Sequence, residues 1–254
     1  MPSFDAADAI EAFWAARGRG EWFPAAWHGR LSNDEAYQIL FGLMGRRLAA
    51  GERQIGWKVG LTSKAIQQQF NVHEPVFGCI LESEPSGHVF APGDLINPGF
   101  ENELCLHLGK DLSGSITLED ARAAIDVVHP SLEIIETRGN LTEQLALALA
   151  DNAQQKTIIL GSPVSLPAQP ESVEARVLIN GEVVATGTGD AVLGNPLNSV
   201  VWLAAKLAEF GRFLKAGEII MSGSFTRQFQ IRPGDSIRCE FRGIGAVETG
   251  MTTT

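Results

Sequence analysis

Three glutamates are the residues of this chain whose type and spacing are best suited to chemistry. Glu101 and Glu103 are separated by one residue in an apolar stretch, and Glu133 lies between Leu132 and Ile134. Side chains at positions i and i+2 of a strand share a face, with Cα atoms roughly 6 to 7 Å apart, so one ion can meet both carboxylates. Magnesium takes oxygen ligands at about 2.1 Å and keeps several waters, so three converging carboxylates would leave room for a substrate. For an isolated E-x-E the hydrated face of an ordinary strand is the commoner explanation, and neighbouring motifs must decide.

A lysine in an apolar strand is the second candidate. Lys58 lies between Gly56 and Gly60 in the run GWKVG. Burial lowers the pKa of a lysine and an acidic neighbour restores it, so Lys58 can serve as an acid/base or as an anchor for a substrate carboxylate. An edge-strand lysine whose amine reaches water explains the same residues as well.

His107 and a small-residue bend offer further polar groups. His107 shares the odd-numbered strand face with Glu101 and Glu103, and it can support a metal ligand or act as a base, although a lone strand histidine is more often simply hydrogen-bonded. No histidine pair has a zinc-binding spacing such as H-E-x-x-H. The bend at Ser222–Arg227 is suited to main-chain N–H contacts with an anion. No dinucleotide-binding G-x-G-x-x-G lies between a strand and a helix.

The elements that must position these residues are mainly strands. Residues 1 to about 50 are predicted to form a helical segment appended to a main domain of residues 51–254, with a capping box at Ser32 and Glu35 and a stop at Gly51. From Ile55 onward short β-like runs alternate with turns, and Asn180-Gly181 predicts a two-residue hairpin. Helices are expected at about 117–128, 141–153 and 198–210. The fold class is therefore mixed α and β.

The composition limits the kinds of partner that the protein can be expected to bind. The formal charge is −10 with an isoelectric point near 5.0, and no basic run forms a stripe, which argues against nucleic acid or an anionic membrane as partner. The three cysteines form no C-x-x-C pair, and the acidic N-terminus lacks the pattern of a signal peptide. We therefore expect reduced thiols and a cytoplasmic protein without a membrane span.

Ordered motifs make the chain resemble the 2-keto-4-pentenoate hydratase and 2-oxo-3-hexenedioate decarboxylase family, which shares its fold with the C-terminal domain of fumarylacetoacetate hydrolases. The resemblance runs from about residue 30 to the end. Its motifs are GWKVGLTSKAIQQQ (56–69), EPVFG (74–78), ENE (101–103), SLEII (131–135), ADNA (150–153), LGNPLNSVVWLA (193–204) and EIIMSGSFTR (218–227).

The resemblance implies a site as well as a fold. The fold would be a twisted, mixed β-roll or sandwich flanked by helices, in a homo-oligomer that can associate with a pathway decarboxylase or hydratase. A Mg²⁺ or Mn²⁺ ion would be held by Glu101, Glu103 and Glu133, with Lys58 as the catalytic acid/base or substrate anchor. Substrate contacts would come from Leu61, Thr62, Ser63, Gln154, Ser222, Gly223 and Ser224.

The family's substrates are 2-oxo acids or their dienols, small molecules from the catabolism of aromatic compounds. A divalent ion stabilises negative charge on the 2-oxygen, so water can add at C4 of the 2-oxo-3-enoate, or carbon dioxide can leave from a dioate. Our leading hypothesis is a metal-dependent hydratase of a 2-hydroxy-2,4-dienoate. The alternatives are a decarboxylase of 2-oxo-3-hexenedioate, a C–C hydrolase of an acylpyruvate, and a non-catalytic partner subunit.

Three positions depart from the family pattern. Val76 stands where hydratases usually carry an aspartate, which favours the decarboxylase, whereas SGSFTR at 222–227 resembles the hydratase branch. Gln154 replaces the common serine after ADNA, and His107 replaces an apolar residue. Together these changes predict a divergent substrate.

Overall fold

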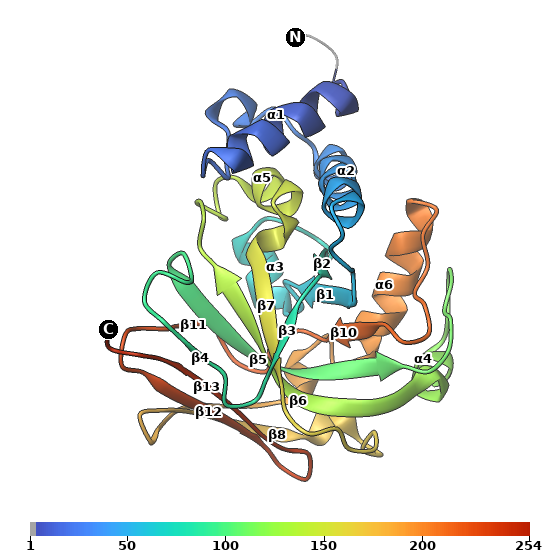
Figure 1. The fold of residues 1–254 in the computed structure, drawn as a ribbon. Helices are drawn as coiled ribbons and strands as arrows, with labels where there is room; N and C mark the ends of the chain where they lie inside the picture. Colours follow the sequence, from blue (N-terminus) through green and yellow to red (C-terminus); the bar gives the residue numbers. More distant parts are fainter. Residues whose placement is uncertain (1–3) are drawn as a thin grey trace.

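The computed structural model describes residues 4–254, and its helices and strands form the mixed α and β architecture that the sequence predicts. The strands make two sheets of eight and five strands. The smaller sheet packs beneath the larger one, and α1 and α2 lie at the far end of the molecule from it (Figure 1).

The larger sheet contains the strands that carry the candidate residues. Its order is β2-β1-β10-β5-β6-β7-β3, and β11 also pairs with β5. It is mixed, because β1 runs parallel to β10 and β3 parallel to β7, whereas β5 and β6 are antiparallel. Its strands are β1 (Gly56–Gly60), β2 (Val76–Ile80), β3 (Ser83–Pro85), β5 (Pro98–Leu108), β6 (Ile125–Glu136), β7 (Gln155–Leu160), β10 (Ile219–Met221) and β11 (Phe229–Gln230).

The smaller sheet has the order β4-β13-β12-β8-β9. The hairpin predicted at Asn180-Gly181 is confirmed, since these residues have φ values of 53° and 83° and join two antiparallel strands. The strands of this sheet are β4 (Val89–Phe90), β8 (Glu174–Ile179), β9 (Glu182–Thr188), β12 (Ser236–Phe241) and β13 (Gly245–Met251).

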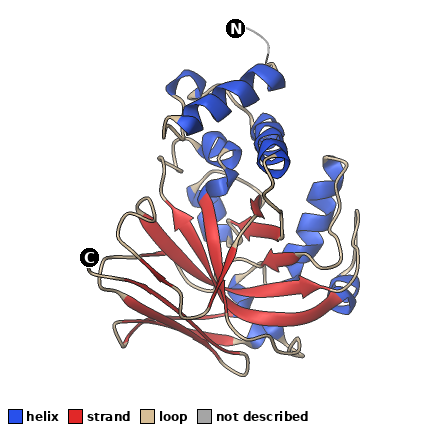
Figure 2. Cartoon of the chain, viewed as in Figure 1, coloured by secondary structure: helices blue, strands red, loops and turns tan. Residues whose placement is uncertain are grey.

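Helices flank the sheets, as Figure 2 shows. They are α1 (Ala6–Gly18), α2 (Asn33–Ala49), α3 (Lys64–Gln69), α4 (Leu118–Ala124), α5 (Leu145–Ala150) and α6 (Leu197–Glu209), with short 3₁₀ turns η1 (Ala25–Trp27), η2 (Asn152–Gln154), η3 (Pro170–Ser172) and η4 (Gly189–Ala191). The capping box at Ser32 is confirmed, and so is the helix that ends before Gly211. Two predicted helices are shorter than expected. α4 ends where the β-branched run of β6 begins, and α5 ends before a left-handed turn.

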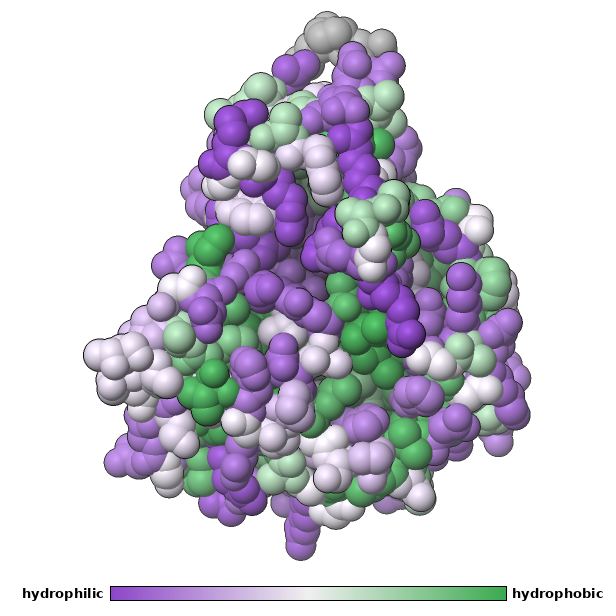
Figure 3. Space-filling view, in the orientation of Figure 1, coloured by the Kyte–Doolittle hydropathy of each residue, from purple (hydrophilic) through white to green (hydrophobic). Residues whose placement is uncertain are grey.

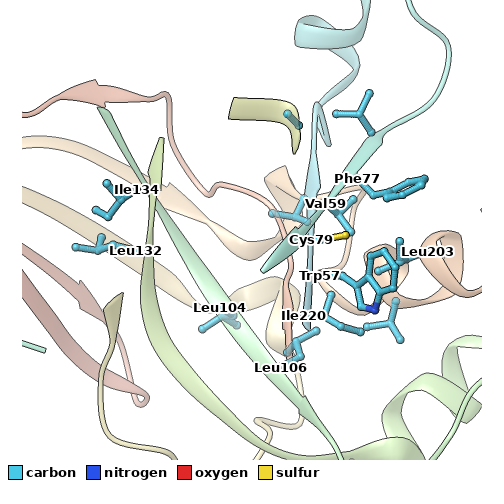
Figure 4. Close-up of a cluster of buried hydrophobic side chains, with 14 of the residues drawn as sticks. Trp57, Val59, Phe77, Cys79, Leu104, Leu106, Leu132, Ile134, Leu203 and Ile220 are labelled. Carbon is cyan, nitrogen blue, oxygen red and sulfur yellow. The ribbon is translucent and has the colours of Figure 1, made fainter. Parts of the chain in front are cut away.

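The two faces of β5 are buried in different surroundings. Leu104 and Leu106, on the even-numbered face, belong to the main hydrophobic core together with Leu132 and Ile134 of β6 (Figure 4). Cys105, on the odd-numbered face, packs instead in a small separate cluster with Ile80, Ile158, Ile219 and Met221. The odd-numbered face is the one that also carries Glu101 and Glu103.

The N-terminal helices share the main core. Tyr37 of α2 stacks on Phe77 of β2 with ring centroids 4.0 Å apart, and Phe13 of α1 belongs to the same cluster. The division at residue 50 stays a prediction. Hydrophilic residues cover much of the face drawn in Figure 3, over the N-terminal helices as well as the sheets. Within residues 4–254, no helix combines the length and hydropathy needed to cross a membrane.

Candidate metal and substrate site

The three glutamates converge because β5 and β6 are antiparallel neighbours. Glu101 is paired directly with Glu133, and Glu103 with Ser131, so all three side chains lie on one face of the two strands. One carboxylate oxygen from each glutamate lies within 4.8 Å of those of the other two. Glu103 and Glu133 are fully buried, and Glu101 is half-buried. The convergence predicted from the sequence is therefore what the fold produces.

Burial and mutual repulsion dominate the electrostatics of this cluster. Burial raises the pKa of Glu101 to about 7, the charge of Glu133 adds to the rise, and Lys58 opposes it. Burial raises the pKa of Glu103 well above its usual range, and the charges of Glu133 and Glu101 raise it further. The pKa of Glu133 is also raised by burial, against the lowering effect of Lys58. Such a group needs protons or a cation to offset its charge.

The residues present fit a divalent cation. Glu103 Oε1 and both carboxylate oxygens of Glu133 are buried and take part in no hydrogen bond among the residues described. Buried oxygens without hydrogen-bond partners are costly unless another group satisfies them. An all-oxygen donor set of this kind suits Mg²⁺ or Mn²⁺ rather than zinc.

Lys58 faces the cluster from the neighbouring part of the sheet. Its strand β1 lies between β2 and β10, so Lys58 is not an edge-strand residue, and it is only 4% exposed. Its Nζ lies 3.4 Å from Glu133 Oε1. Gly60 and Gly78 leave space for this side chain, because a Cβ atom at Gly60 would lie 3.3 Å from Lys58 Nζ and one at Gly78 would lie 3.4 Å from its Cε. The buried lysine is therefore paired with an acid, as its position in an apolar strand requires.

The bend after β10 supports the cluster through its main chain. The Gly223 N–H donates to Glu103 Oε2 over 2.7 Å, so the anion that this bend binds is a carboxylate of the protein itself. Gly223 has a φ of 111°, and a Cβ atom there would lie 2.5 Å from Thr62 Oγ1. Only glycine combines that conformation with that close approach.

Two cavities open onto Glu101. The first, about 430 Å³, has a mostly apolar lining: Lys58, Gly60, Leu61, Val76, Glu101, Ile135, Thr137, Gly139, Asn140, Leu141, Leu145, Leu149, Ala153, Gln154 and Gln228. The second, about 500 Å³, shares Gly60, Leu61, Glu101, Leu141 and Gln228 and adds Thr62, Ser63, Ile66, Gln69, Phe70, Ala191, Ser224, Phe225, Thr226 and Arg227. The half-buried carboxylate thus stands where the two spaces meet.

The other predicted residues are placed unevenly. Leu61 lines both cavities, Thr62, Ser63 and Ser224 line the second, and Gln154 lines the first. Ser222 is fully buried, and its carbonyl oxygen accepts a hydrogen bond from Ser199. His107 pairs with Ile219 and Val127 near the far end of β5 and lies in neither lining. The fold does not bring His107 to the carboxylates.

Sequence reasoning missed several residues of this region. Asn152 bridges to Cys79 in both directions: Oδ1 accepts from the Cys79 N–H over 2.7 Å, and Nδ2 donates to its carbonyl over 2.8 Å. Arg138, 4% exposed at its side chain, binds Glu136 and Asp151 and lies between Thr137 and Gly139, which line the first cavity. The available signal for Asn152 was the polar pair Asp151-Asn152 at the end of the apolar run 145–150. Nothing in the sequence singled out Arg138.

Comparison with known proteins decides the family. Residues 63–252 match the family described as fumarylacetoacetate (FAA) hydrolase C-terminal. The chain belongs to this family. It is 38% identical over 225 residues to a 2-keto-4-pentenoate hydratase of Paraburkholderia xenovorans (strain LB400), covering 86% of this chain and 84% of that protein.

Similarity to decarboxylases is nearly as strong. A 4-oxalocrotonate decarboxylase of Pseudomonas putida is 37% identical over 222 residues, covering 84% of this chain and 83% of that protein. Among solved structures, 4-oxalocrotonate decarboxylase from Pseudomonas putida G7, complexed with magnesium and adipate, superposes with a TM-score of 0.90 at 31% identity, covering 99% of this chain and all of that one. The predicted family and fold are both confirmed.

Proposed function

We propose that this protein is a divalent-metal-dependent hydratase that adds water to a 2-hydroxy-2,4-dienoate with an apolar tail, giving a 4-hydroxy-2-oxo acid. The observation that carries the proposal is the first cavity. It opens onto the glutamate cluster, its walls are largely aliphatic, and Lys58 is the one cationic side chain among the described residues that line it. Because Lys58 is paired with Glu133, the described lining of this cavity offers no unpaired cationic side chain that could bind a second carboxylate of the substrate.

The proposed roles follow from the positions of the side chains. A divalent cation at Glu101, Glu103 and Glu133 would supply the positive charge that stabilises negative charge on the substrate's 2-oxygen. Lys58 faces both Glu133 and the cavity, so its ammonium group can deliver a proton to C5 of the dienol as the 2-hydroxyl loses one. Water then adds across C3 and C4 of the resulting 2-oxo-3-enoate.

Val76 limits which groups can transfer protons at the tail. It lines the first cavity, where a Cβ atom added at Gly60 would lie 3.4 Å from Val76 Cγ2 and 3.3 Å from Lys58 Nζ. Besides the candidate metal ligand Glu101, Lys58 is the titratable side chain among the described lining residues of this cavity. The aliphatic part of the wall lowers the local polarity, which would strengthen the electrostatic contacts of the bound head group.

Decarboxylation is the second candidate, and three observations favour it. The wall at Val76 carries no carboxylate, and Arg227 lines the second cavity, where it could meet a distal carboxylate. The decarboxylase that superposes on this chain holds adipate, a dicarboxylate. Loss of carbon dioxide from a 2-oxo-3-enedioate would use the same cluster of glutamates.

One assay separates the two candidates. The Mg²⁺-loaded protein is incubated with 2-hydroxypenta-2,4-dienoate, with 2-hydroxyhexa-2,4-dienoate and with 2-oxo-3-hexenedioate, and diene absorbance and carbon dioxide are followed. We expect loss of the diene from the monoacids with formation of the 4-hydroxy-2-oxo acid. Carbon dioxide release from the dioate without hydration of either monoacid would refute the proposal.

The assembly belongs to the same proposal. We expect a homo-oligomer, and association with a pathway decarboxylase or hydratase stays a prediction. Light scattering of the purified chain, alone and mixed with such a partner, measures both.

A further inference from the structure

A buried ion cluster adjoins the lining of the first cavity, because Arg138 lies between Thr137 and Gly139, which both line it. The Arg138 guanidinium donates from Nε to Asp151 Oδ2 over 2.5 Å, from Nη1 to Glu136 Oε2 over 2.8 Å and from Nη2 to the Asp151 carbonyl over 3.0 Å. Side-chain exposure is 4% for Arg138, 5% for Asp151 and 7% for Glu136. A fork of this kind fixes the relative position of the two segments it joins.

The segment that Arg138 holds is an unusual turn. Asn152, Ala153 and Gln154 have successive φ values of 57°, 48° and 60°, a left-handed run without glycine. Each such residue costs of order 1–3 kcal/mol and persists only where its surroundings impose it. Here the surroundings are Arg138, which binds the preceding Asp151, and Asn152, which bridges to Cys79.

This turn fixes the orientation of the Gln154 side chain. The main-chain N–H of Arg138 donates to Gln154 Oε1 over 2.6 Å. An N–H group can only donate, so the oxygen of the amide must face Arg138 and its NH₂ group must point elsewhere. Gln154 is also a lining residue of the first cavity, together with Lys58 and Val76. Among the described residues the amide NH₂ group donates no hydrogen bond, so it is available as a donor to a ligand in the cavity.

The N-terminal segment braces the cluster from the outside. Arg17 of α1 lies 3.8 Å from Asp151, and the Trp22 ring lies 5.1 Å from the Arg138 guanidinium and 4.6 Å from that of Arg17. The chain also approaches closely at Gly139, where an added Cβ atom would lie 2.3 Å from the Phe23 ring. These contacts come from residues that precede the part matched by the family, residues 63–252.

We propose that Arg138 is a positioning residue, braced by Trp22, that holds the left-handed turn so that the amide NH₂ of Gln154 donates a hydrogen bond to an oxygen of the bound 2-oxo acid. The assignment rests on the proposed function for the class of ligand. It gives the N-terminal helical segment, which carries no catalytic group of its own, a part in substrate recognition.

The test uses binding of 2-oxopentanoate, a saturated five-carbon 2-oxo acid, to the Mg²⁺-loaded protein by calorimetry. Gln154→Glu keeps the oxygen that Arg138 needs and removes the donor, and Arg138→Met removes the fork. We expect each to weaken binding about 10-fold or more, and the double variant to be no weaker than the worse single variant, because both remove the same contact. Mg²⁺ affinity in the absence of the acid should stay unchanged.

Arg122→Met is the matched control. Arg122 is also a partly buried arginine that donates to main-chain carbonyls, those of Pro167 and Ala168, but it lines neither cavity. It should leave 2-oxopentanoate binding unchanged, and its effect should add to that of Gln154→Glu. If Arg138→Met does not fold, Trp22→Ala should weaken binding of the acid and Trp22→Phe should restore it.

The outcomes separate this assignment from the proposed reaction. Wild-type affinity in Gln154→Glu, or additive effects of Arg138→Met and Gln154→Glu, would overturn the assignment even if the enzyme hydrates dienoates. Coupled losses in a protein that binds 2-oxopentanoate but hydrates no dienoate would support the assignment and refute the hydratase.

Discussion

Mg²⁺ should stabilise the folded protein more strongly at about pH 8 than at about pH 6. The folded pKa of Glu101 is raised from 4.5 to about 7, mainly by burial, and the pKa values of Glu103 and Glu133 are raised as well. A group with a raised folded pKa contributes stability that is complete below its unfolded value and is lost as the pH rises through its folded value. The metal-free protein therefore loses stability between about pH 4.5 and pH 7, where a bound cation would restore it.

The size of the effect follows from the same shift. The rise for Glu101 corresponds to about 3 kcal/mol, at about 1.4 kcal/mol per unit of pKa, and this is an upper bound because the residue is only half-buried. Mg²⁺ at about 100 times its Kd stabilises the folded state by about 2.7 kcal/mol, a rise in Tm of about 5–10 °C for a chain of this size. At about pH 6 protons compete, and each pH unit below 7 weakens binding about tenfold per proton displaced.

The assay is thermal unfolding with EDTA and with Mg²⁺ at both pH values, on the wild type and on Glu103→Gln. The variant can keep the hydrogen bond from Gly223 but loses one buried charge. We therefore expect it to lose the Mg²⁺-dependent rise, and its metal-free form to be at least as stable as the metal-free wild type at about pH 8. A rise in Tm that is equal at the two pH values, or that persists in Glu103→Gln, would refute the assignment of the cluster as the metal site.

Three further substitutions test single contacts. Lys58→Met should lower kcat by about 10²- to 10⁴-fold while calorimetry still detects Mg²⁺ binding, because it removes a proton carrier and no metal ligand; complete loss of Mg²⁺ binding would contradict this role. Gly223→Ala should lower the free energy of unfolding by more than about 1 kcal/mol in urea, since its φ and the contact with Thr62 both oppose a Cβ atom; wild-type stability would contradict the argument. Asn152→Ala should cost about 3 kcal/mol in the same assay, because it leaves the buried Cys79 N–H and carbonyl without partners; a loss within error would show that other groups replace the amide.

The sequence was sufficient where local pattern and topology agree. Alternation along residues 101–108 predicts the strand, and the position of Glu101 opposite Glu133 follows once β5 and β6 pair. Capping at Ser32 and the Asn180-Gly181 turn are local signals and are confirmed. Helix ends were less predictable. The residues after Ala124 favour a strand, and this strand is stabilised by neighbouring strands that come together only in the folded sheet. The end of α4 could therefore not be placed from the local sequence.

Contacts made by tertiary structure could not be predicted in the same way. In the sequence Arg138 is an ordinary charged residue after a strand. Its structural role depends on contacts with Asp151 and on the left-handed turn at 152–154, which follow α5. His107 illustrates the converse, because it shares a strand face with Glu103 but lies four residues farther along β5, where its cross-strand neighbours are apolar. Sharing a face is necessary for convergence and is not sufficient.

The two departures at Val76 and Gln154 belong to one cavity and are best understood together. With no carboxylate at position 76, the polar side-chain groups facing the first cavity beside Glu101 include Lys58, which is paired with Glu133, and Gln154, whose amide is fixed by Arg138. In the proposed reaction Lys58 then carries the proton, and Gln154 supplies a hydrogen-bond donor that cannot act as a base. The substrate would thus be oriented by a neutral amide instead of an anion. This suits a monoacid whose only charged group is bound by the cation at the glutamate cluster. A neutral donor adds no repulsion to the negative charge that develops there.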